Sequence, residues 1–108
     1  MEFKNIVAIV RTSVLEAVEE KLKSIGVMGI SVSPVKGYGE YANFYKQDWL
    51  VTNAKLNIFA KASRVDLIVS TILEAAHVGS PGDGIVAVMP VDKLYRIRTK
   101  AEFEADEI

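Results

Sequence analysis

The loop 77–86, HVGSPGDGIV, contains the residues whose types and spacing are best suited to chemistry, three glycines around a single acid, Asp83. Gly79, Gly82 and Gly84 can adopt positive φ angles, which lets successive backbone N–H groups converge on an anion such as phosphate. The same residue types also form ordinary turns and helix ends. The loop has neither the GxGxxG pattern nor the GK[ST] ending of known phosphate-binding loops. Taken alone, it leaves two interpretations open, a helix cap with a turn or an anion-binding cradle.

Two arginines near the carboxyl end could supply the positive charge that such a cradle lacks. Arg96 and Arg98 in LYRIRTK are two residues apart, so an extended segment would project both to the same side. Paired guanidinium groups bind phosphate through charge-assisted, bidentate hydrogen bonds. Alternatively, they form weak surface ion pairs with the acidic tail EFEADEI. His77 could contact a phosphate or respond to pH, but a histidine at the end of a helix more often interacts only with the helix dipole.

The composition indicates a single globular domain over residues 1–108. The chain is 50% hydrophobic and 25% charged, and its net charge of −1 gives no reason to expect binding to nucleic acid or an anionic membrane. It contains no cysteine and one histidine, which excludes disulfides and argues against a metal site. The amino-terminal apolar run is too short for a membrane span and does not have the form of a signal peptide. We therefore expect a cytoplasmic protein without membrane insertion.

Hydrophobic periodicity predicts a strand–helix–strand unit that occurs twice. Continuous or alternating apolar residues predict strands at 3–10, 30–35, 54–61 and 85–91. The segments between the paired strands have apolar stripes at helical spacing. The stripes comprise Val14, Leu15, Val18, Leu22 and Ile25 in the first segment and Val65, Ile68, Val69, Ile72 and Ala76 in the second.

Each predicted helix has start and stop signals of its own. Ser13 and Glu16 have the spacing of a capping box, and Gly26 is a plausible stop for the first helix. Ser63 and Asp66 repeat that spacing in the second helix, for which Gly79 is the expected stop.

Two such units predict a ferredoxin-like α+β fold, a four-stranded antiparallel sheet with both helices on one face. This layout leaves the second face of the sheet uncovered. Because the strands carry apolar residues on more than one face, we expect that face to drive assembly into a closed homo-oligomer.

The runs VKGYG, GSPGDG and PVDKLYRIRT, in that order around two βαβ units, resemble the PII signal-transduction family over roughly residues 3–99. The resemblance implies a homotrimer that binds adenine nucleotides in clefts between neighbouring subunits. It also implies a T-loop at about 37–50, a B-loop at about 78–85 and a C-terminal segment at 92–108. These expectations agree with the fold and the oligomer predicted from the residues.

The resemblance assigns specific positions to the nucleotide. Two strand residues match positions beside the adenine, and two glycines match the start of the T-loop, where the backbone approaches the phosphates. The B-loop glycines and their acid match residues around the phosphates, which two arginines reach, one of them from the neighbouring subunit. In order along the chain these residues are Ile30, Ser31, Gly37, Gly39, Gly79, Gly82, Asp83, Gly84, Arg96 and Arg98. With both parts present, the cradle interpretation is favoured over the simple turn.

The chain departs from the family at positions that determine ligand choice. Ile85 stands where the usual B-loop has a lysine, so we expect a weaker preference for ATP, with ADP or AMP bound at least as tightly as ATP. Lys36 or Lys46 could substitute for the missing lysine. The glutamine and lysine of the family's 2-oxoglutarate site correspond to Tyr41 and Asn53. Neither can repeat the ionic contact, so the resemblance implies that 2-oxoglutarate sensing is absent.

The T-loop is shorter than is usual for the family, since only residues 40–47 separate Gly39 from Asp48. The tyrosine that is uridylylated in enteric members has no secure counterpart, Tyr45 being the nearest candidate. Aromatic residues on a loop are favoured anchors for a partner, although these rings could also pack against their own trimer. The predicted partner-binding residues are Tyr41, Phe44, Tyr45 and Trp49.

The expected function is regulation by a nucleotide-responsive trimer whose T-loop contacts a target, either a membrane transporter or a metabolic enzyme. Divergent relatives serve bicarbonate or metal transport, which adds a small anion such as bicarbonate as a candidate second ligand. One alternative is a slow nucleotide phosphohydrolase in which Asp83 or Glu40 orients water. Another is a ligand-free structural trimer of the same fold. We expect a regulatory protein rather than an enzyme, with any hydrolysis incidental.

Overall fold

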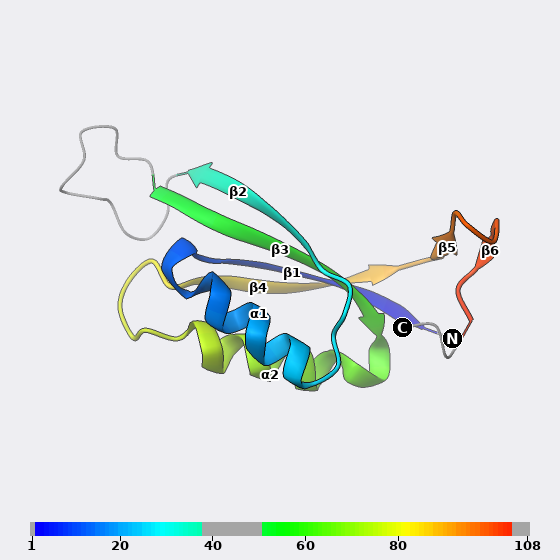
Figure 1. Cartoon of the computed structure of the whole chain (residues 1–108), viewed down its shortest axis with the longest axis horizontal. Coiled ribbons are helices and arrows are strands. Elements are labelled where there is room, and N and C mark those ends of the chain that lie inside the picture. The colour runs from blue at the N-terminus through cyan, green and yellow to red at the C-terminus, as the bar shows by residue number, and fades with distance from the viewer. Residues whose placement is uncertain (1, 38–50, 105–108) are drawn as a thin grey trace.

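The computed structural model describes residues 2–37 and 51–104 of the chain, and Figure 1 shows how their elements are arranged. Two 3₁₀ turns and two two-residue strands accompany the main helices and strands. In chain order the elements are β1 (Phe3–Arg11), η1 (Thr12–Val14), α1 (Leu15–Ser24), β2 (Ser31–Gly37), β3 (Val51–Lys61), η2 (Ala62–Arg64), α2 (Val65–Ala76), β4 (Gly84–Val91), β5 (Tyr95–Arg96) and β6 (Ala101–Glu102).

The four long strands form one antiparallel sheet in the order β2–β3–β1–β4. Ile6 of the central strand β1 lies opposite Ile58 on β3 and Val88 on β4, which fixes the register. Both α1 and α2 lie on the same face of this sheet (Figure 1). The predicted ferredoxin-like α+β fold is confirmed.

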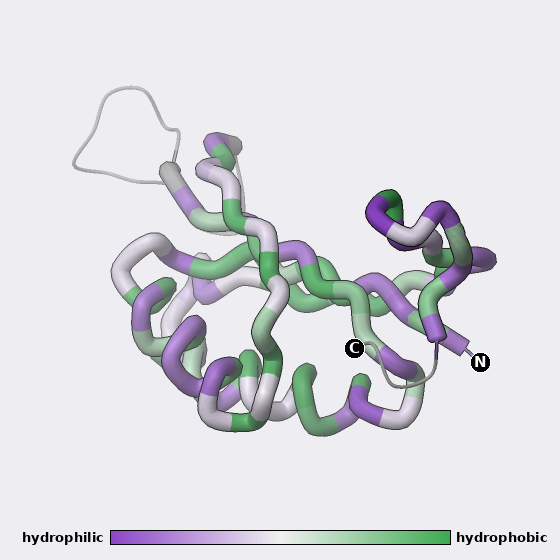
Figure 2. The backbone as a smooth tube through the Cα atoms, turned by 45° about the vertical axis from the view of Figure 1, so that its right-hand side comes forward, coloured by the Kyte–Doolittle hydropathy of each residue, from purple (hydrophilic) through white to green (hydrophobic). Residues whose placement is uncertain are grey.

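The core lies between the helices and the sheet, where the apolar stripes meet alternate residues of the strands. Figure 2 shows hydrophobic and hydrophilic positions alternating along the helices and strands. Both predicted helical stripes face inward, and each fully buried aliphatic side chain contributes about 1.5–3 kcal/mol relative to exposure. The largest fully buried side chains are Ile6, Val10, Val18, Leu22, Leu56, Ile58, Ile68 and Ile72.

The predicted capping boxes are wrong. Both helices begin through a 3₁₀ turn, α1 after Val14 and α2 after Arg64, and neither start has a side-chain capping bond. Ser13 and Ser63 lie within these turns rather than at the extended N-cap position that a capping serine requires. The 3₁₀ turns form backbone hydrogen bonds with i→i+3 spacing, and these satisfy some of the groups at the helix start that a capping side chain would otherwise bond.

The helix ends differ from each other. Gly26, at φ +88, ends α1 as expected: its N–H donates to the Lys23 carbonyl at 3.0 Å and the Val27 N–H donates to the Leu22 carbonyl at 3.0 Å. This is the Schellman arrangement, with Leu22 and Val27 buried in the same cluster. The expected stop of α2 at Gly79 is wrong, because the helix ends at Ala76 and His77 is already extended, at φ −66 and ψ 124.

The second face of the sheet is open, with mainly apolar side chains over β1 and β4 and mainly polar ones over β2 and β3. Strand alternation puts Val7 and Ile9 of β1 on this face together with Phe59 of β3 and Ile85 and Met89 of β4. The last three side chains are exposed, Ile85 to 63%. No helix in the described part of the chain has both the length and the apolar character needed to cross a membrane.

Candidate functional site

The glycine loop between α2 and β4 is organised around the carboxylate of Asp83. The backbone N–H groups of Val78 and Gly79 donate to Oδ2 of Asp83 at 2.9 and 2.8 Å. Gly79, Gly82 and Gly84 all have positive φ angles, of 90°, 91° and 117°. The loop therefore does form an anion-binding nest, and in this chain its anion is the carboxylate of Asp83.

Arg11, the last residue of β1, attaches this loop to the sheet. Its Nη2 donates to the Pro81 carbonyl at 2.6 Å and to Oγ of Ser80 at 3.1 Å, and its Nε lies 3.3 Å from Oδ1 of Asp83. Arg11 was not among the site residues predicted from the sequence. The available signal was its position at the end of a predicted central strand, because β4 begins beside β1, with Gly84 opposite Val10.

These contacts set the charge state of the loop. Hydrogen bonds from the N–H groups of Val78 and then Gly79 lower the pKa of Asp83 below its usual value of 3.8, and the nearby Arg11 and His77 act in the same direction. Nδ1 of His77 lies 3.9 Å from Oδ2 of Asp83. The structure thus gives His77 a carboxylate neighbour in addition to the end of α2. Arg11 balances the charge of Asp83, so the loop as a whole brings little net charge to a ligand.

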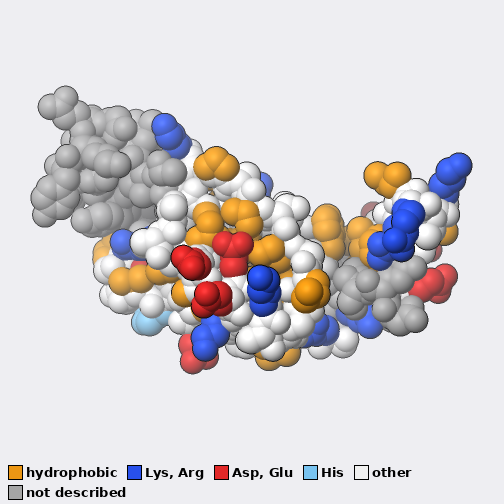
Figure 3. Space-filling model, in the orientation of Figure 1, with side chains coloured by type: hydrophobic (Ala, Val, Ile, Leu, Met, Phe, Trp, Pro, Cys, Tyr) orange, Lys and Arg blue, Asp and Glu red, His pale blue; other side chains and the backbone are white. Residues whose placement is uncertain are grey.

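A cavity of about 440 Å³ lies at the other end of the sheet. Figure 3 shows the molecule hollowed between its main body and the β5–β6 hairpin. The walls are the α1–β2 connection, the end of β3, η2 and the C-terminal segment. The lining residues are Gly26, Val27, Met28, Gly29, Ser31, Asn57, Ile58, Phe59, Ala60, Lys61, Arg64, Ile68, Leu94, Arg96 and Phe103, none of which is acidic.

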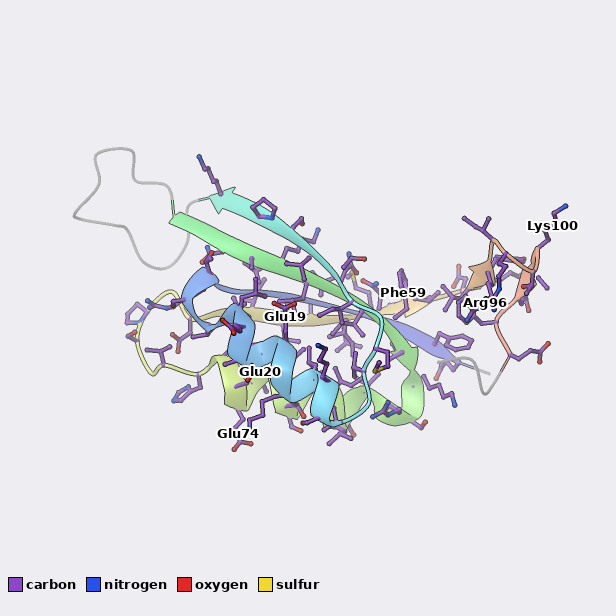
Figure 4. All side chains as sticks on the ribbon, viewed as in Figure 1. Glu19, Glu20, Phe59, Glu74, Arg96 and Lys100 are labelled. Atoms are coloured by element: carbon purple, nitrogen blue, oxygen red, sulfur yellow. The ribbon has the colours of Figure 1, made fainter. Side chains whose placement is uncertain are left out.

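Aromatic contacts hold the C-terminal wall of the cavity in place. The guanidinium of Arg96 lies 4.4 Å from the centre of the Phe103 ring, and Phe103 meets Phe3 edge-to-face at 6.3 Å. The Phe103 N–H donates to the Leu94 carbonyl at 2.9 Å. Figure 4 shows Phe59 on the sheet and Arg96 on the hairpin beside this hollow.

Polar contacts fix the other walls. Nδ2 of Asn5 donates to Oδ1 of Asn57 at 2.7 Å, which orients the Asn57 amide on the open face of the sheet. Nη2 of Arg64 donates to the Ile25 carbonyl and so ties the start of α2 to the end of α1.

Two of the predicted nucleotide residues, Ser31 and Arg96, line the same cavity. Ile30 packs against the hydrophobic core instead. The expected extended segment for the arginine pair is wrong: β5 ends at Arg96, and Arg98 lies exposed in the turn 97–100. In that turn the Lys100 N–H donates to the Arg96 carbonyl at 2.9 Å, and this bond closes the hairpin.

Other predicted residues lie at the opposite end of the sheet. Gly37 ends β2 opposite Val51, beyond the Arg11 end of β1, the same end as the glycine loop. Figure 1 shows that loop, between α2 and β4, far from the β5–β6 hairpin. The whole of β4 lies between the two, roughly 23 Å for its eight residues at about 3.3 Å per step. One chain therefore does not bring the glycine loop and the cavity together.

Several predicted positions fall on residues that the structure does not describe. The T-loop predictions for partner and ligand contacts therefore stay predictions. These positions are Gly39, Glu40, Tyr41, Phe44, Tyr45, Lys46 and Trp49.

The comparisons with known proteins define the class to which this fold and loop belong. The model of the family "Nitrogen regulatory protein P-II" matches residues 3–101, nearly the whole chain. The chain belongs to this family of signalling proteins, which confirms the resemblance found in the sequence.

Individual relatives agree with this assignment. The chain is 36% identical to nitrogen regulatory protein P-II 2 of Methanothermobacter thermautotrophicus, with 89% of this chain and 90% of that protein covered. It is 34% identical to nitrogen regulatory protein P-II of Azospirillum brasilense, with 89% and 92% covered. Against the P-II homolog of Arabidopsis thaliana the identity is 32%, with 98% of this chain but only 58% of that longer protein covered.

The fold also matches a solved structure of the family. The crystal structure of Arabidopsis thaliana PII bound to citrate superimposes with a TM-score of 0.83 and 36% sequence identity. The match covers 95% of this chain and 90% of that one. That relative was crystallised with a small anionic ligand.

Proposed function

We propose that this protein is a regulatory homotrimer that binds an adenine nucleotide between the glycine loop of one subunit and the cavity of another. The observation that carries the proposal is the separation of these two parts. The loop offers backbone groups at one end of the sheet, and the cavity offers an apolar and cationic wall at the other end. A second copy of the chain is the simplest means of joining them.

The open face of the sheet supports the assembly. Phe59 of β3 and Ile85 and Met89 of β4 remain exposed in one chain, and Val7 and Ile9 of β1, which lies between these strands, are half-buried. An apolar surface on three strands of a small domain favours burial against another copy. A trimer that covers this face would also bring loops and cavities of neighbouring subunits into proximity.

The ligand follows from the chemistry of the two parts. Ser31, Phe59 and Arg96 offer a hydroxyl, a ring surface and a cation for a base and the start of its phosphate chain. In the glycine loop, Asp83 already occupies the N–H groups of Val78 and Gly79, so its role is to shape the loop while other backbone N–H groups approach the phosphates. Arg98, exposed on the hairpin, is free to reach toward the phosphates across a subunit boundary.

Ile85 governs the choice between nucleotides. It directly follows the glycine loop and projects an apolar side chain where a cation would contact a terminal phosphate. The affinity for ADP or AMP is therefore equal to or higher than the affinity for ATP. Asn53 lies on the open face opposite Arg11 and carries no charge, in keeping with loss of 2-oxoglutarate sensing. Bicarbonate remains a candidate second ligand.

Regulation requires that the nucleotide bind one conformation of the T-loop more tightly than another, because equal affinity shifts no population. The target, a membrane transporter or a metabolic enzyme, would recognise the favoured conformation. A phosphohydrolase role finds no support in the geometry of Asp83, because its carboxylate is engaged by two N–H groups and Arg11.

The test is titration calorimetry with ADP, AMP and ATP on the wild type, an Arg96→Ala, Arg98→Ala variant and a Lys93→Ala control. Lys93 is an exposed cation on the same segment outside the cavity lining. Loss of two charge-assisted contacts should weaken binding by about tenfold or more, with no change in the control. Native mass spectrometry should show a trimer. A monomer, or an absence of saturable binding of all three nucleotides, would overturn the proposal.

A further inference from the structure

Lys61 and Arg64 are two cations in the cavity that the proposed nucleotide site does not use. Both side chains are half-buried, and neither forms an ion pair with any residue in the described ranges. Arg64 donates one hydrogen bond to the Ile25 carbonyl, which leaves its other donors and its charge uncompensated. No acidic residue is among the described residues that line the cavity, so these cations are available to an anionic ligand.

The cations lie at one end of an ordered row along β3. Strand alternation puts Asn57, Phe59 and Lys61 on the same face, with about 6.7 Å between neighbours. Along the strand the row presents the Asn57 amide, the Phe59 ring and the Lys61 ammonium in that order, and all three residues line the cavity. The Phe59 side chain is 46% exposed, so its ring is available to a planar base. If a base stacks on Phe59, the sugar attached to it lies within reach of Lys61 and Arg64.

The amide of Asn57 restricts what that sugar can carry. Its Oδ1 already accepts a hydrogen bond from Asn5, so its Nδ2 donors are the groups left for a ligand. Together with Lys61 and Arg64, the described residues on this side of the cavity present donors and positive charge, and no carboxylate is among them. Such surroundings suit a phosphate better than a free ribose hydroxyl.

We infer that the nucleotide carries a second phosphate on its ribose, at the 2′ or the 3′ oxygen, and that Lys61 and Arg64 bind it. The inference rests on the proposed function, in which the 5′ phosphate chain runs to the glycine loop of another subunit and so leaves these cations unpaired. The planar guanidinium of Arg64 can hold two phosphate oxygens at once, and the Lys61 ammonium supplies a point charge. The ligand class is thus a nucleoside bisphosphate with one phosphate at the 5′ oxygen and one on a ribose hydroxyl.

The experiment compares adenosine 2′,5′-bisphosphate and adenosine 3′,5′-bisphosphate with ADP on the full chain, because all three carry the same number of phosphates in different places. Calorimetry should show one of the bisphosphates bound about tenfold more tightly than ADP, the gain expected from one or two charge-assisted contacts. Lys61→Ala should reduce this ratio severalfold. Arg64→Lys should retain part of the ratio, and Arg64→Met should abolish it.

The control is Lys4→Ala, which removes a lysine from the same end of the sheet, opposite Ala60 but outside the cavity lining. It should leave the ratio unchanged. Because Arg64 also ties the helices together, circular dichroism checks each variant, and Lys61→Ala keeps the test valid if the Arg64 variants unfold. ADP binding without a bisphosphate preference, or a preference undiminished in Lys61→Ala, would overturn the inference and leave the proposed function standing. Failure of all three ligands to bind would overturn both.

Discussion

Replacing Gly84 with alanine tests how the glycine loop is joined to the sheet. Gly84 begins β4 at φ +117, and a Cβ added there would lie 1.8 Å from the Ile9 carbonyl oxygen and 2.9 Å from its carbon. Real Cβ atoms essentially never approach closer than 3.0 Å. The obstacle is the backbone of the central strand β1, which cannot move aside by a side-chain rotation. Alanine therefore requires the start of β4 to move away from β1.

The cost has two parts. A residue with a Cβ at this φ is strained by about 1–3 kcal/mol. Displacement of β4 by roughly 1 Å also weakens the pairing of Gly84 with Val10, at about 1 kcal/mol for each backbone hydrogen bond. We expect a total loss of about 3 kcal/mol, a large share of the roughly 5–15 kcal/mol that stabilises a domain.

Urea unfolding followed by circular dichroism measures this loss, and Gly29→Ala is the matched control. Gly29 has no positive φ and no atom within 4 Å of an added Cβ, so its replacement should change the free energy of unfolding by less than about 0.5 kcal/mol. Both variants must be compared at one protein concentration, since assembly alters apparent stability. Equal stabilities of the two variants would refute the close approach of Gly84 to Ile9.

Three further substitutions test other features. Ile72→Ala in the core should cost about 2–5 kcal/mol in urea unfolding, whereas Leu73→Ala, at 56% exposure, should cost under about 1 kcal/mol. Lys100 has φ +59 although it is not glycine, so Lys100→Gly should stabilise the hairpin by about 0.5 kcal/mol, which hydrogen exchange of the Lys100 amide would detect. The pKa of Asp83 is lowered in the folded state, so its contribution to stability is present above about pH 3.8 and declines as the pH falls further. The stability difference between wild type and Asp83→Asn should therefore shrink below pH 3.8 in acid titrations, and a constant difference would contradict the Asp83 contacts.

The sheet and the core could be predicted from the sequence because burial imposes a period that the residues display. Leu56 and Ile58 alternate with Lys55 and Asn57, and the structure buries the first pair. The helical stripes could be predicted equally well, since buried residues such as Leu22 in α1 and Ile72 in α2 each belong to a set of apolar residues at helical spacing. These signals depend on which face a residue occupies, and that follows from the pattern alone.

The helix starts could not be predicted in the same way. Ser13 with Glu16 has the spacing of a capping box, but spacing does not report whether the serine is extended or lies within a 3₁₀ turn. Gly79 was expected to end α2 because glycine often does, whereas its positive φ serves the loop that closes on Asp83. Local sequence names the residue types of a turn and does not fix the residue at which the turn begins.

The site was predictable in its parts and not in its arrangement. The glycine loop was located, yet Arg11 was missed because its contacts with Ser80 and Pro81 span about seventy positions of the chain. Arg96 and Arg98 were expected to act as a pair, but the chain turns after Arg96 and only that residue lines the cavity. Such relations depend on tertiary packing.

The charge balance of the loop links nucleotide binding to assembly. Asp83 fills the N–H nest and Arg11 offsets its charge, so the loop alone offers a phosphate backbone dipoles and little net attraction. The cations of the cavity, Arg96 above all, lie at the far end of the same chain. Under the proposed function, a nucleotide then gains its full set of contacts only between subunits. Because a ligand stabilises the state that binds it, the nucleotide should strengthen the trimer as much as the trimer strengthens nucleotide binding.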